Sequence, residues 1–147
     1  MTESSSAAAM VERLARRRAR LLPVLGLFLI IQQAAYFSHG DGTRTVDLVR
    51  ISGWVMMSAV ILAVLTTGGF WRHNRAVRAM LDDEGTRANR AAALSTGFVC
   101  VIVTAIVLFV MQGAWEFTVG QVIHLIVTAG LFSALLRFSI LERRALG

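Results

Sequence analysis

The chain has 147 residues, a hydrophobic fraction of 56% and a mean hydropathy of +0.64, more than a soluble domain of this size carries. Its formal net charge is +6, and because the chain has no Lys, all fifteen basic residues are Arg. These Arg cluster where apolar runs end, which is typical of a membrane protein facing anionic headgroups and argues against direct binding of nucleic acid.

An Arg-rich segment, residues 1–20, precedes the first apolar run at 21–37. At about 1.5 Å per residue this run is long enough to cross the hydrocarbon layer as a helix. A cleavable signal peptide is the alternative interpretation. The residues after the run offer only a weak small-residue cleavage site at Ser38 and Gly40, and further apolar runs follow, so a membrane span is predicted.

Three more apolar runs, 51–70, 94–111 and 121–136, contain no Asp, Glu, Lys or Arg. Thirteen of the fifteen Arg lie in segment 1–20, in the central interval 71–93 and in the tail 137–147, so the positive-inside rule places all three in the cytoplasm. The sequence therefore predicts an all-α protein. It would be an integral membrane antiparallel four-helix bundle of the bacterial inner membrane, with one membrane domain at 21–147 and both termini cytoplasmic.

Small residues mark contact faces between helices in lipid, where no hydrophobic force drives helices together. They recur at helical spacing in three spans, at Ala59, Ala63 and Thr67, at Thr96, Cys100 and Thr104, and at Gly130 and Ala134. These stripes suit a four-helix bundle, and they would equally serve a homo-oligomer. Cys100, the single cysteine, is interpreted as a packing residue.

The spans lack the membrane-embedded carboxylate on which small four-span multidrug exporters depend, so transport of that type is not predicted. Polar residues instead gather in the outer half of the bundle. Hydrogen bonding between helices is the first interpretation of these residues. The alternative is a ligand pocket for a quinone headgroup, another lipid-like ligand or haem, formed by Gln32, Tyr36, Gln112, Gln121 and His124.

Haem would need a second axial ligand on another span. His39 and His73 do not lie at matching depth, and Met56, Met57 and Met111, which could substitute, are interpreted as packing residues. His39, Asp41, Glu116 and His124 have no recognised metal-binding spacing, and no catalytic motif is present. A non-enzymatic protein without metal or cofactor is therefore predicted.

The central interval 71–93 divides into two parts. Residues 71–81 fit an amphipathic helix that continues from the second span, with its Arg opposite an apolar arc. The acidic break at 82–84 suits the start of a new helix that runs through 86–93 into the third span, where acids favour the helix dipole.

Capping and positive-inside anchoring explain the charges of this interval, and docking of a cytoplasmic protein is the second interpretation. The residues expected to bind such a partner are Arg75, Arg78, Asp82, Asp83, Glu84, Arg87 and Arg90. With Ala91–Ala93 following, Asp83, Glu84, Arg87 and Arg90 resemble the Asp-Glu…Arg loop before the third span of uncharacterised small four-span bacterial membrane proteins. The resemblance implies pairing with a soluble regulator held at the membrane. We therefore expect an accessory or regulatory subunit.

Overall fold

The computed structural model describes residues 2–38, 44–68 and 84–145, and all regular structure within these residues is α-helical. The helices are α1 (Thr2–Ser38), α2 (Arg44–Thr67), α4 (Glu84–Met111) and α5 (Val119–Ala145). Each contains a stretch long and apolar enough to cross a bilayer. The chain is a multi-pass membrane protein, and the predicted all-α four-helix fold is confirmed.

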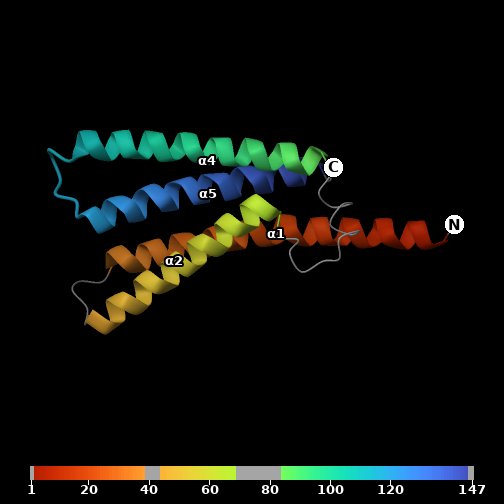
Figure 1. The fold of residues 1–147 in the computed structure, drawn as a ribbon, viewed down its shortest axis with the longest axis horizontal. Coiled ribbons are helices and arrows are strands. Elements are labelled where there is room, and N and C mark those ends of the chain that lie inside the picture. The colour runs from red at the N-terminus through yellow and green to blue at the C-terminus, as the bar shows by residue number, and fades with distance from the viewer. Residues whose placement is uncertain (1, 39–43, 69–83, 146–147) are drawn as a thin grey trace.

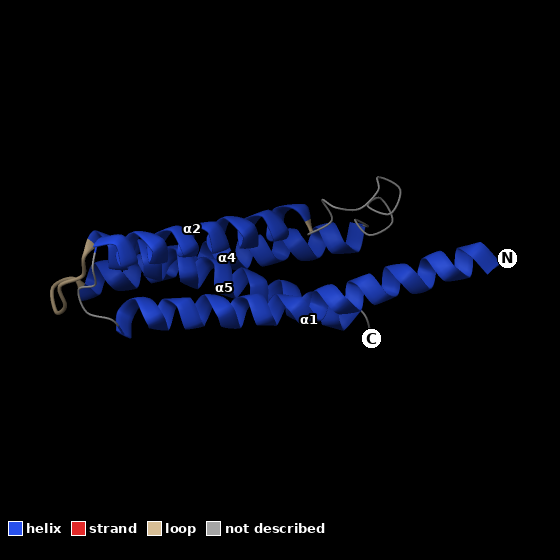
Figure 2. Ribbon diagram, turned by 90° about the horizontal axis from the view of Figure 1, so that it is seen from below, coloured by secondary structure: helices blue, strands red, loops and turns tan. Residues whose placement is uncertain are grey.

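Helix α5 is the centre of the bundle, because it contacts each of the other three helices. Figure 1 shows α4 running beside α5, with α1 on the other side of α5 and α2 crossing obliquely. We call the end that holds Ser38, Met111 and Val119 the outer end, after the predicted topology. The opposite end, which holds Glu84 and Ala145, is the inner end (Figures 1 and 2).

The core is narrow and lies along one face of α5. Leu22, Leu29, Ile61, Leu65 and Phe138 are fully buried in it, and they come from α1, α2 and α5. Most other apolar side chains of the spans point outwards; Phe109 and Val110, for example, are about 70% exposed. A surface of this kind suits hydrocarbon rather than water, and the helices are then held together by close packing.

The closest helix contact joins α4 to α5 through small residues. A Cβ placed on Gly97 would lie 2.8 Å from the carbonyl oxygen of Gly130 and 2.9 Å from the Cβ of Ala134. Gly130 and Ala134 were predicted contact residues, but on α4 the buried stripe passes through Ala93 and Gly97. The predicted stripe at Thr96, Cys100 and Thr104 is only partly buried, so the face of α4 is rotated by one residue from the prediction.

Helix boundaries depart from the predicted spans mainly at the inner end. Helix α1 begins at Thr2 rather than near residue 21, so Pro23 lies inside the helix instead of in its first turn. Pro23 has no N–H to donate to the carbonyl of Ala19, one turn earlier. Helix α5 continues to Ala145, beyond the predicted limit at 136, and α2 ends at Thr67, before a Gly68 of φ 70°. This left-handed glycine is a common helix ending.

Candidate functional site

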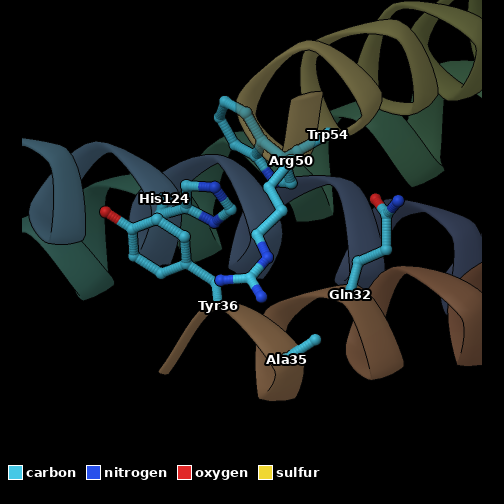
Figure 3. A pocket seen from close by; sticks show the side chains of 6 residues that line it. All are labelled: Gln32, Ala35, Tyr36, Arg50, Trp54 and His124. Atoms are coloured by element: carbon cyan, nitrogen blue, oxygen red, sulfur yellow. The ribbon is translucent and has the colours of Figure 1, made fainter. Parts of the chain in front are cut away.

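The outer end holds a cluster of aromatic and polar side chains built around His124 of α5. The His124 ring lies between Tyr36 of α1 and Trp54 of α2, with centroid distances of 4.0 Å and 3.9 Å and interplanar angles of 10° and 26°. His124 is 5% exposed. Three helices therefore enclose one imidazole ring, as Figure 3 shows.

Hydrogen bonds fix the orientation of this ring. Nδ1 of His124 lies 2.8 Å from Oε1 of Gln33, and the hydroxyl of Thr128 donates to the same oxygen at 2.9 Å. The indole N–H of Trp54 in turn donates to Thr128 Oγ1 at 3.4 Å. Because an amide oxygen only accepts, Nδ1 of His124 carries the proton in this arrangement. In the neutral ring, Nε2 then has a lone pair.

That Nε2 atom is buried and has no hydrogen-bond partner among the described residues, and the same holds for Oε1 of Gln32. Buried polar atoms are normally paired with protein or water, so these two atoms indicate a place for a bound group. Both residues line a cavity of about 100 Å³. The other residues that line it are Ala35, Tyr36, Arg50 and Trp54 (Figure 3).

The cavity volume limits what fits inside. At about 30 Å³ per molecule it holds roughly three waters, and it is smaller than the ~150 Å³ cavity that accommodates benzene. A quinone ring or a haem is larger than this space, so either would extend beyond it through its open side. Both faces of the His124 ring are already covered by Tyr36 and Trp54, so a stacked aromatic ligand has no free face to use.

Arg50 gives the cavity its positive charge. Its side chain is 34% exposed, and Nη1 lies 4.0 Å from Oδ1 of Asp47, one turn earlier on α2. Figure 3 shows the guanidinium group near Tyr36 at the side of the cavity. The site thus presents a cation, a neutral imidazole with a free lone pair and an unpaired amide oxygen. It can bind a small molecule that donates hydrogen bonds to Nε2 and accepts them from Arg50.

The structure brings together three of the five residues predicted to form the ligand pocket. Gln32, Tyr36 and His124 line one cavity. Gln112 is exposed just beyond the end of α4. The side chain of Gln121 accepts a hydrogen bond from the backbone N–H of Thr118 at 2.9 Å, while Thr118 Oγ1 accepts one from the N–H of Gln121 at 3.3 Å.

This reciprocal pair is a capping box at the start of α5, and it gives Gln121 a structural role. We expect Thr118→Ala to destabilise the protein by about 1 kcal/mol, because one N–H of the first turn loses its acceptor. Thermal unfolding in detergent measures the change. Thr118→Ser keeps the hydroxyl and serves as the control, so a loss as large in that variant would contradict the capping role.

Two residues of the site were not predicted to belong to it. Trp54 lies in the predicted span 51–70, and Arg50 lies in the link that precedes this span. In the structure both line the cavity. Their spacing carries a weak signal, since residues four apart on a helix share a face. The spacing of His124 and Thr128 carries the same signal, and both of these side chains approach Gln33.

At the inner end, the structure describes three of the seven residues predicted to bind a protein partner. Glu84 and Arg87 are exposed in the first turn of α4. Arg90 is half-buried, and its Nη1 donates to the backbone oxygen of Thr66 at 3.0 Å, near the end of α2. Arg75, Arg78, Asp82 and Asp83 lie outside the described residues, as does the helix predicted at 71–81.

Glu142, near the end of α5, is 4% exposed, and its Oε1 lies 3.5 Å from Nδ2 of Asn89 on α4.

In residues 2–38, 44–68 and 84–145 no group of three or more His, Cys, Asp or Glu side chains is placed to hold a metal ion. Of the four residues considered above as metal ligands, His39 and Asp41 lie outside these ranges. Comparisons with known protein families, with curated proteins and with solved structures gave no match.

Proposed function

We propose that the chain is a non-enzymatic accessory or regulatory protein of the bacterial inner membrane that binds a protein partner at its inner, cytoplasmic end. The observation that carries the proposal is the length of α1. This helix has 37 residues, about 55 Å, whereas the hydrocarbon core is about 30 Å thick. Figures 1 and 2 show its N-terminal part extending alone beyond the other helices.

The extension displays charge on one side. Arg13, Arg16, Arg17 and Arg20 are spaced i, i+3, i+4 and i+7, so they share a helix face, and all four are exposed. Helices gain most of their stability from packing against other elements, so the part of α1 that extends beyond the other helices is a natural place for a partner to dock. The charge of this face favours a partner with an acidic surface.

The first turn of α4 lies at the same end and adds Glu84 and Arg87, both exposed. The resemblance to small four-span proteins that accompany soluble regulators supports the same role. Docking through the rest of the interval 71–93 stays a prediction. Arg90 is better explained as a structural residue, because its guanidinium group donates to the Thr66 backbone at the end of α2.

The test is affinity purification of the tagged chain from native membranes in mild detergent. We expect Arg13→Gln, Arg16→Gln, Arg17→Gln and Arg20→Gln, combined, to lose protein partners that the wild-type chain retains, and Glu84→Gln with Arg87→Gln to weaken their retention. A variant with Val99→Leu and Val103→Leu, which changes exposed positions within a span and keeps them apolar, serves as the control. If all the variants retain the same partners, the proposal is wrong.

A second function is favoured by the buried, unpaired Nε2 of His124: binding of a small polar ligand at the outer end. The volume of the cavity points to a water-sized hydroxyl or oxo-acid group rather than to haem or a quinone ring. An absorption spectrum and an organic extract of purified protein test this directly. We expect neither a haem band nor bound quinone, and finding either at one equivalent would refute the small-ligand version of the function.

A further inference from the structure

A second cavity lies on the membrane-facing side of the bundle, between α1 and α5. It has a volume of about 340 Å³, and every residue that lines it is apolar or glycine: Leu22, Pro23, Gly26, Leu27, Ile30, Phe132, Leu135 and Leu136. Leu27 is 59% exposed and Leu136 is 47% exposed, so the groove opens towards lipid. The apolar lining of the groove suits a hydrocarbon chain and offers no partner to a polar group.

The groove exists because α1 lacks side-chain bulk where it faces α5. A Cβ on Gly26 would meet only the ring of Phe132, at 3.4 Å, which is at the limit of ordinary contact. Pro23, one turn earlier, has a short ring in place of a long side chain. Between these two residues and the exposed Leu136 there is room for an acyl chain lying along the helices.

Two contacts between α1 and α5 show at which depth of the bundle the groove lies. Gly26 lies beside Phe132, and Gln33 bonds His124 near the outer end. The groove, which begins at Leu22, therefore lies in the half of the bundle nearer the inner end. An acyl chain in it belongs to a lipid of the inner leaflet, whose headgroup sits at the level where the Arg residues begin.

Two exposed Arg stand on the groove side of their helices at that level. Arg20 precedes Pro23 and Leu27 by three and seven residues, and Arg143 follows Leu136 by seven, which are spacings that keep residues on one helix face.

We propose that this groove is a binding site for an anionic glycerophospholipid, with one acyl chain between α1 and α5 and the phosphate between Arg20 and Arg143. Basic residues at the cytoplasmic mouth of a groove between membrane helices are suited to anionic headgroups. The apolar groove holds the chain and the two Arg select the charge. The site is separate from the His124 cavity and does not depend on a protein partner.

Native mass spectrometry of the whole chain, released from micelles with equal amounts of phosphatidylglycerol and phosphatidylcholine, tests the site. The wild-type chain is expected to retain phosphatidylglycerol preferentially. Each Arg near an anionic lipid contributes about a fivefold factor, so Arg20→Gln with Arg143→Gln should weaken retention of phosphatidylglycerol about 25-fold. Gly26→Leu should reduce retention of both lipids, because its side chain fills the groove.

The matched control is Arg137→Gln with Arg144→Gln, which removes the same charge from exposed positions of α5 that lie about 100–120° around the helix from Arg143. This control should keep the wild-type preference. The proposal is overturned if the wild-type chain retains both lipids equally, or if the two double variants lose the preference to the same extent. The latter result would show that the total charge of the inner end, rather than the two groove-facing Arg, determines the preference for phosphatidylglycerol.

Discussion

Gly97→Ala is expected to destabilise the bundle by about 1–3 kcal/mol, although it adds only a methyl group. That methyl would lie 2.8 Å from the carbonyl oxygen of Gly130 and 2.9 Å from Ala134 Cβ, and the first of these neighbours is backbone that does not swing away. Helices α4 and α5 would have to separate. Thermal unfolding in detergent, followed by circular dichroism, measures the loss.

Gly130→Ala should act in the same direction, because its new Cβ would meet Cγ2 of Val101. The control is Gly53→Ala on α2, where the nearest atom is Nε2 of Gln32 at 3.8 Å. That variant should be neutral or slightly stabilising, since Ala favours a helix more than Gly does. Equal melting temperatures for the Gly97→Ala and Gly53→Ala variants would contradict the close α4–α5 contact.

The second large effect is expected from His124→Ala, which should cost about 3–5 kcal/mol, as truncations of buried aromatic rings do. Tyr36 and Trp54 would lose the ring that lies between them, and Gln33 Oε1 would lose one of its two hydrogen-bond donors. Chemical unfolding in detergent gives the free energy, and Trp fluorescence reports the change around Trp54.

His124→Phe separates packing from polarity. It keeps a ring between Tyr36 and Trp54, and Thr128 still donates to Gln33, so most of the stability should return. Binding of a small polar ligand should not return, because Nε2 is gone. If the Ala and Phe variants were equally unstable, the imidazole hydrogen bond rather than the stacking would hold the outer end together.

The spans and the fold class could be predicted because they depend on length, hydropathy and the position of Arg, all of which are visible in the sequence. The face of α4 could not, since Gly97 and Thr96 are both small and a membrane helix is apolar on every side. The helical extension of α1 was not predicted, although the Ala, Arg, Glu and Leu before Arg20 are good helix formers. The Arg residues of this segment were interpreted as a topology signal, and its helix propensity was not considered.

The site was partly predictable because depth along a span follows from residue number. Gln32, Tyr36 and His124 lie at similar depth and do meet at one cavity. Gln112 and Gln121 lie at the ends of their helices, where capping and turn geometry decide the direction of a side chain. Trp54 and Arg50 were missed because an aromatic ring or an Arg near the interface has an ordinary explanation there.

Both proposed functions assume that the Arg-rich inner end faces the cytoplasm and the His124 cavity faces outwards. Cysteine labelling measures this directly, because Cys100 is the only cysteine and Cys100→Ala removes it. In that background Gly113→Cys and Glu84→Cys place single thiols at exposed positions near opposite ends of α4.

In spheroplasts treated with a membrane-impermeant maleimide, the account predicts that the Gly113→Cys protein reacts at once and that the Glu84→Cys protein reacts only after lysis. The reverse pattern would contradict the topology. It would also move the partner surface out of the cytoplasm.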